Sequence, residues 1–157
     1  GAPCTTHLKK AVRQKYHNTQ KPENHILGFE YEAKEIRRAE RFKKSYEFLN
    51  PLFPLIDFQL TGEQCHYLVK HKWGVELPLM YRLGYPNNNC VGCVKGGMGY
   101  WNKIREDFPH VFKERSEQER EIGRSCIKGV FLDELKPGKG INKPIVPNCG
   151  LFCDNKF

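Results

Sequence analysis

Two cysteines in one short loop are the residues of this chain best suited to chemistry. Cys90 and Cys93 follow the polar run 87–89 and precede Gly96 and Gly97. The C-x-x-C spacing lets two thiolates of one tight turn face the same point, as a metal ion, an iron–sulfur cluster or a redox disulfide requires. The asparagine and glycine flanks supply the backbone freedom and the N–H groups that such a turn needs.

A cysteine pair needs two further ligands to close a tetrahedral site. Cys4, just before a predicted helix, and Cys65, early in another helix, are the best partners by position, because helix N-termini stabilise thiolates. Cys149 and Cys153 form a second, wider pair that could complete the same site or close a disulfide. Cys126 is expected to be a small buried side chain, and Cys65 has the same alternative interpretation.

The charge of the chain suggests a polyanionic partner such as a nucleotide, a sulfate ester or a nucleic acid. The chain has 26 Lys and Arg against 18 Asp and Glu, a formal net charge of +8. The alternative explanation is that these charges only keep the protein soluble. Lys9 lies at the start of a predicted helix, and Arg38 and Arg41 fall within about one helical turn. The alternative is a solvated helix face that Glu35 and Glu40 balance.

Several other classes of site are not indicated. The six histidines form no H-x-x-x-H or H-E-x-x-H pattern, and neither a G-x-S-x-G motif nor a Walker P-loop is present. No stretch approaches the roughly 18 apolar residues of a membrane span, and no signal-peptide pattern opens the chain. Seven irregularly spaced cysteines without secretion features favour a reduced, cytoplasmic setting.

The elements that must position these residues are mostly helices. Apolar periodicity, capping residues and prolines predict six helices and one short buried strand, at 25–29. Few strands indicate that part of the sheet lies elsewhere, and prolines and glycines make the chain irregular from 136 onward. The expected helices begin at Thr5 or Thr6 and pass Tyr16, then run over 33–48, from Thr61 to near Gly74, and over 79–83, 99–108 and 109–122.

Taken in order, several short motifs resemble the later half of phosphoadenosine phosphosulfate (PAPS) reductases. The likeness extends to the wider PP-loop, or adenine nucleotide alpha hydrolase-like, superfamily, and to its phage- and bacteroides-type PAPS reductase-like members. It covers most of the chain. The motifs are Cys4-Thr5 with Leu8-Lys9, Ile26-Leu27-Gly28, Phe53 to Asp57, Pro78 to Tyr85, Asn88 to Trp101 with its C-x-x-C pair, and Phe131 to Leu135.

The resemblance implies an α/β fold, the helix-rich portion of a doubly wound parallel sheet. Residues 1–135 would form the PAPS reductase-like domain, and 136–157 an irregular tail with Cys149 and Cys153. The Ser-Gly-Gly-x-Asp-Ser loop that grips the nucleotide in this superfamily is absent from the chain. A segment upstream of Gly1 or a partner chain would supply it.

The resemblance also implies a site and a substrate class. Cys4, Cys65, Cys90 and Cys93 would hold an iron–sulfur cluster of the 4Fe–4S type, while zinc suits the same thiolates. An adenylated or sulfated nucleotide would be reduced or would transfer sulfur. The catalytic residue is unassigned, although Cys149 or Cys153 could match a carboxy-terminal catalytic cysteine of the simplest family members. Lys9, Arg38 and Arg41 would neutralise the anion.

Two rival functions remain open. One is a non-catalytic, metal-stapled module that binds nucleic acid through its positive charge. The other is a structural phage protein that keeps the fold without the activity.

Overall fold

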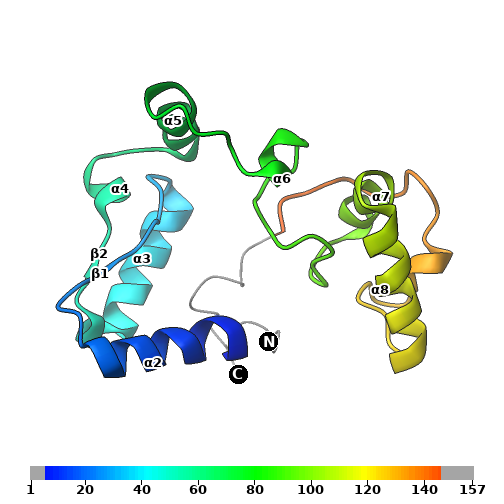
Figure 1. Cartoon of the computed structure of the whole chain (residues 1–157), viewed down its shortest axis with the longest axis horizontal. Coiled ribbons are helices and arrows are strands. Elements are labelled where there is room, and N and C mark those ends of the chain that lie inside the picture. Colours follow the sequence, from blue (N-terminus) through cyan, green and yellow to red (C-terminus); the bar gives the residue numbers. More distant parts are fainter. Residues whose placement is uncertain (1–5, 146–157) are drawn as a thin grey trace. The chain divides into compact units, whose positions relative to one another are not determined.

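The computed structural model describes residues 6–145, which form two compact units, residues 6–76 and residues 77–145 (Figure 1). The chain is a helix-rich α/β protein with one small parallel sheet. The expected doubly wound sheet and the expected 1–135 domain stay predictions.

The helices and strands divide between the two units. The elements of the first unit are η1 (Thr6–Lys10), α2 (Ala11–Gln20), β1 (His25–Ile26), α3 (Ala33–Ser45), η2 (Glu47–Leu49), β2 (Pro51–Leu52), α4 (Pro54–Asp57), α5 (Gly62–Tyr67) and η3 (Leu68–Lys72). The elements of the second unit are α6 (Leu79–Arg82), α7 (Met98–Asp107), α8 (Pro109–Ile122) and η4 (Leu132–Glu134).

The first unit contains a parallel strand–helix–strand arrangement. Strands β1 and β2 pair in parallel, with His25 opposite Pro51 and Ile26 opposite Leu52, and α3 forms the connection between them. The strand predicted at 25–29 is therefore shorter than expected. Strand β2 falls where the sequence predicts no helix or strand. Its proline stands first in the strand, where a missing N–H costs no interior ladder bond.

The core of the first unit lies under α3. Ala39 and Phe42 on the inner face of the helix are buried, as its periodicity predicts. The helix ends at Ser45 rather than near Phe48, because the chain tightens into η2 to bury Leu49 and then reverses at Asn50, whose φ is 43°. A short polar side chain tolerates this left-handed conformation better than most others.

Two other predictions for the first unit are confirmed. Helical structure runs from Thr6 to Gln20 through η1 and α2. The helix expected from Thr61 begins there as α5 with a capping box: the Thr61 hydroxyl oxygen accepts a hydrogen bond from the Gln64 N–H at 3.3 Å, and the Gln64 side-chain oxygen accepts one from the Thr61 N–H at 2.8 Å. Together these bonds satisfy N–H groups that the first turn would otherwise leave unpaired.

The second unit packs α7 and α8 around a core of large side chains. Trp101, Ile104 and Leu132 are fully buried, and Tyr85 and Tyr100 are nearly so. The two predicted helices are confirmed within a residue, with Pro109 at the first position of α8, where its missing N–H is not needed. The expected short helix near 79–83 is α6. Residues 136–145 are irregular, as predicted.

Within residues 6–145, no helix has both the length and the apolar character that crossing a membrane requires.

Candidate functional site

The loop that carries Cys90 and Cys93 closes as two successive tight turns in the second unit. The Cys93 N–H donates to the Cys90 carbonyl oxygen at 3.1 Å, and the Gly96 N–H donates to the Cys93 carbonyl oxygen at 2.9 Å. Gly92 stands between the cysteines with a φ of 70°, a left-handed conformation that glycine adopts without steric cost. The loop is thus a tight turn, as the spacing predicts.

Tyr100, in the first turn of α7, fixes the backbone of both cysteines. Its hydroxyl oxygen accepts a hydrogen bond from the Cys93 N–H at 3.0 Å and donates its proton to the Cys90 carbonyl oxygen at 2.9 Å. The side chain is 3% exposed, and burial raises the pKa of its hydroxyl above the ordinary value. The hydroxyl therefore stays protonated and keeps both bonds, so the turn is held in one shape.

The cysteine turn has a packed side and an open side. Val91 and Cys93 pack against the core of the second unit. A Cβ added at Gly92 would lie only 2.7 Å from Cγ1 of Val111 on α8, so the turn rests directly on that helix. Cys90 is exposed and Cys93 is half-buried. Cys90 is thus open to solvent, whereas Cys93 lies against the core of the unit.

A positive charge lies beside the turn. The Nε atom of Arg115 on α8 is 3.6 Å from the point where a Gly92 Cβ would stand. The same guanidinium contacts Glu114 at 3.5 Å and donates to Gln118. Opposite charges attract, so Arg115 would favour an anionic group bound at this turn.

The two other described cysteines have environments that favour the protonated thiol. Burial, and then the Glu30 carboxylate, raise the pKa of Cys65 on α5 above its ordinary value. A metal at Cys65 would therefore have to displace a proton. Burial and Glu119 raise the pKa of Cys126 to about 12. Cys126 is half-buried and packs against the core, in agreement with its interpretation as a small packing side chain.

The four predicted metal ligands are distributed over different parts of the chain. Cys90 and Cys93 share one turn of the second unit, Cys65 belongs to the first unit, and Cys4 lies outside the described residues, as do Cys149 and Cys153. Among residues 6–145, no group of three or more His, Cys, Asp or Glu side chains converges on a point suited to a metal ion. The four-cysteine site stays a prediction.

The predicted anion-binding residues all belong to the first unit. Lys9 is exposed on η1, and Arg41 is exposed on α3. Arg38 donates to the Glu35 carboxylate at 3.1 Å, and its guanidinium carbon lies 4.9 Å from the centre of the Phe29 ring. Phe29 comes shortly after β1, so Arg38 is held near the carboxyl end of the parallel strands.

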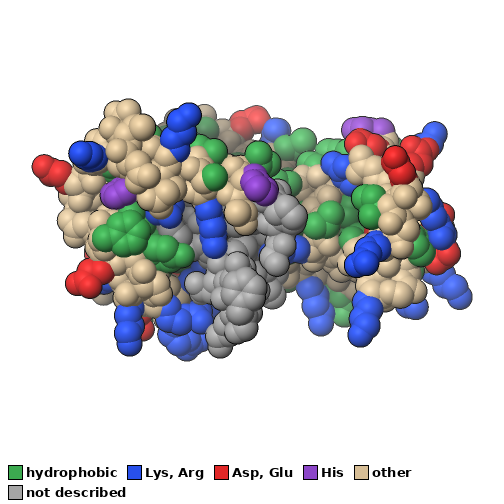
Figure 2. Space-filling model, turned by 90° about the horizontal axis from the view of Figure 1, so that it is seen from below, with side chains coloured by type: hydrophobic (Ala, Val, Ile, Leu, Met, Phe, Trp, Pro, Cys, Tyr) green, Lys and Arg blue, Asp and Glu red, His purple; other side chains and the backbone are tan. Residues whose placement is uncertain are grey.

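A larger basic surface runs along α3. Four exposed basic residues recur at intervals of three or four positions, which places them on one face of the helix. Figure 2 shows further Lys and Arg side chains at the surface, with fewer Asp and Glu among them. We call the α3 residues the basic stripe; they are Lys34, Arg37, Arg41 and Lys44.

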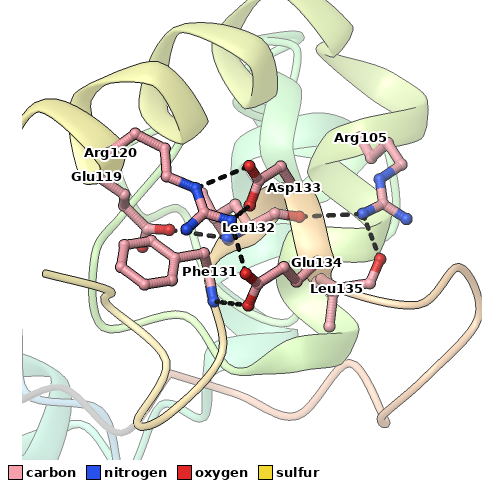
Figure 3. A network of polar contacts seen from close by, with 8 residues as sticks. All are labelled: Arg105, Glu119, Arg120, Phe131, Leu132, Asp133, Glu134 and Leu135. Atoms are coloured by element: carbon pink, nitrogen blue, oxygen red, sulfur yellow. Dashed lines mark hydrogen bonds and ion pairs between the residues drawn. The ribbon is translucent and has the colours of Figure 1, made fainter. Parts of the chain in front are cut away.

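The Phe131–Leu135 motif has a structural role in the second unit (Figure 3). Arg105 of α7 donates to the carbonyl oxygens of Leu132 and Leu135 at 3.3 and 2.6 Å. The buried Glu119 carboxylate accepts the N–H groups of Cys126 and Leu132 at 2.6 and 2.8 Å. These bonds tie the chain after α8 to both helices that support the cysteine turn.

Sequence reasoning missed the two residues that shape this site most. Tyr100 was one of several aromatic residues near the cysteines, and nothing in its type or spacing indicates a hydrogen bond to a loop seven and ten residues earlier. Glu119 lies in a run of charged residues that is typical of an exposed helix face. Its burial follows from the return of residues 126–132, which no local pattern reveals.

A scan against models of known protein families and searches of curated proteins and solved structures found no significant match.

Proposed function

We propose that this chain is part of a PAPS reductase-like protein that acts on an adenylated or sulfated nucleotide. It would use a cysteine-bound iron–sulfur or zinc site. The observation that carries the proposal is the rigid Cys90–Cys93 turn, because one buried hydroxyl fixes both cysteine backbones while Cys90 is exposed and Cys93 is half-buried. Such preorganisation is what a thiolate ligand pair needs.

The donor set fits the proposed metal group. Thiolates bind both zinc and iron–sulfur clusters, and Arg115 supplies positive charge beside the turn. Cys90 and Cys93 would provide two ligands, and Cys4 and Cys65 would provide the others. A cluster supplies electrons or sulfur chemistry when bound, whereas zinc supplies rigidity. If no metal binds, the same pair can close a reducible disulfide.

The first unit supports the nucleotide part of the proposal. Ligands of parallel α/β sheets bind beyond the carboxyl ends of the strands. Arg38 is held close to that end of β1 through Phe29, and it would neutralise the anion together with Lys9 and Arg41. Two parallel strands make a small sheet, and parallel sheets are normally covered on both faces. Further strands and the PP-loop would come from another segment or from a partner chain.

Calorimetric titration with adenosine phosphosulfate and with its 3′-phosphorylated form tests the nucleotide claim. Arg38→Gln and Arg41→Gln should each weaken binding by about tenfold or more, because each removes a charge-assisted interaction. Lys113→Gln is the matched control, since this exposed lysine lies on α8 in the other unit. Unchanged affinity in both arginine variants, or no nucleotide binding by the protein, would overturn the nucleotide claim.

The basic stripe favours a second candidate function, a module that binds nucleic acid. Its four side chains are exposed along a 13-residue helix, and such a row can follow a phosphate backbone. Replacing the four residues of the stripe with glutamine should then make DNA or RNA binding less sensitive to salt. The slope of the logarithm of the binding constant against the logarithm of the salt concentration should fall by about one for each phosphate that the stripe neutralises. Tight, salt-dependent nucleic-acid binding without nucleotide binding would favour this function over the first.

A further inference from the structure

Two histidines meet in the first unit, away from the cysteine turn. His17 lies in the last turns of α2 and His25 begins β1. Nδ1 of His17 is 3.1 Å from Nε2 of His25, and the ring centroids are 5.3 Å apart. Eight positions of sequence and a loop separate the two residues, so no H-x-x-x-H pattern could reveal the pair.

Different contacts position the His17 ring and the His25 backbone. The His17 ring meets the edge of the Phe48 ring with centroids 5.7 Å apart. The backbone N–H of His25 donates to the Asn50 carbonyl oxygen at 3.4 Å, and the Asn50 side chain donates to the Asn24 side-chain oxygen at 2.5 Å. Both histidine side chains are partly buried. The folded unit therefore brings two imidazole nitrogens together before any ligand binds.

The separation of the two nitrogens matches two ligands of one metal ion. With zinc–nitrogen bonds of about 2.0–2.1 Å, neighbouring nitrogens stand about 3.3 Å apart in a tetrahedron and about 2.9 Å apart in an octahedron. The observed 3.1 Å lies between these values. The same distance suits a hydrogen bond in which one ring donates and the other accepts, so a metal ion and a proton would compete for the same lone pairs.

We propose that His17 and His25 form a binding site for a divalent transition-metal ion of the class that prefers imidazole, such as Zn²⁺, Ni²⁺ or Cu²⁺. The protein would provide two ligands, and water would occupy the remaining coordination positions of the metal ion. Imidazole suits these metals, and coordination would join the end of α2 to β1. This site is independent of the cysteine turn, which lies in the other unit.

The charges around the pair determine how strongly it binds. Burial, His17 and then Arg13 lower the pKa of His25 below its ordinary value, which leaves its lone pair available near neutral pH. Arg13 also repels a dication, so the site is expected to be weaker than a three-ligand site. Binding should weaken as the pH falls, because protons compete with the metal ion for the ring nitrogens.

The test is a zinc titration of the full chain after its cysteines have been alkylated, which removes thiolate binding. We expect one bound Zn²⁺ in calorimetry and saturable shifts of two histidine ring signals in nitrogen-15 NMR. His17→Asn and His25→Asn should each lower the affinity by roughly tenfold or more. His110→Asn is the matched control, because His110 is exposed on α8.

The NMR measurement needs no variant, so the proposal can fail even if a histidine substitution unfolds the protein. Absence of saturable histidine shifts in the wild-type chain would overturn it. So would equal losses of affinity in the His110 variant and in the other two. Ring signals that respond to pH but not to zinc would show a shared proton in place of a metal ion.

Discussion

Tyr100 shows how one hydroxyl can determine the geometry of a site that is otherwise a flexible glycine-rich loop. It satisfies a donor on Cys93 and an acceptor on Cys90 at once. Removal of the hydroxyl loses both of these bonds and leaves the Cys93 N–H and the Cys90 carbonyl oxygen with the 3.1 Å bond between them. Each lost bond is worth about 0.5–1.5 kcal/mol.

Tyr100→Phe should therefore lower the free energy of unfolding by about 1–3 kcal/mol. Urea denaturation measures this change, and the reactivity of Cys93 toward a thiol reagent should rise because the turn loosens. Tyr16→Phe is the control, since Tyr16 is 56% exposed, and it should change neither quantity. A Tyr100 variant as stable as the wild type would show that the hydroxyl does not hold the turn.

At the scale of elements, α7 depends on a close approach to the chain that follows α8. A Cβ on Gly99, in the first turn of α7, would overlap the backbone of Ile141 and Asn142. The Asn102 side chain on the same helix donates to the carbonyl oxygens of Lys136 and Lys139 at 3.1 and 2.8 Å. The irregular segment 136–142 is thus held against α7 by shape and by hydrogen bonds.

Gly99→Ala should destabilise the protein by about 1–3 kcal/mol, because overpacking forces the backbone of a neighbouring segment to move. The sign of this stability change is informative, because alanine at an open helix position is about 1 kcal/mol more favourable than glycine. Thermal and urea unfolding provide the measurement. Gly28→Ala is the control, because a Cβ there meets no atom within 4 Å. A stabilised Gly99 variant would contradict the close packing.

Glu119 and Arg120 are neighbours on α8 with different expected effects. Glu119 is 7% exposed and accepts two backbone N–H groups, so Glu119→Gln should cost about 1–3 kcal/mol of unfolding free energy. Arg120 pairs with Asp133 and Glu134 at the surface, where ion pairs contribute little. Arg120→Gln should therefore have the smaller effect in urea denaturation. The reverse order would show that the surface pairs, and not the buried carboxylate, hold the Phe131–Leu135 motif.

At the scale of the whole molecule, the sequence predicts helices better than it predicts the sheet or the polar framework. Capping and proline signals placed α5 and α8 because those signals act within a few residues. Strand β2 was missed because its pairing with β1 depends on residues about 26 positions apart, and its two residues carry no alternating pattern.

The sequence likewise predicts only those features of the candidate site that neighbouring residues determine. The Cys90–Cys93 turn could be predicted from spacing and glycines, which are local. The contacts of Tyr100, Val111 and Glu119, and the meeting of His17 with His25, depend on the tertiary fold. The charge of +8 indicates a class of partner, and the basic stripe shows where part of that charge gathers.

The most direct test of the proposed function is the metal content of the protein purified without oxygen. We predict brown protein with iron and sulfide, an absorbance band near ~400 nm from thiolate-bound iron, and loss of both in Cys90→Ser and in Cys93→Ser. Cys126→Ser should keep them, because that thiol is half-buried and its pKa is raised. Stoichiometric zinc that disappears in the same two variants would keep the site but exclude the cluster. Metal-free protein, or metal that both variants retain, would contradict the assignment of Cys90 and Cys93 as ligands.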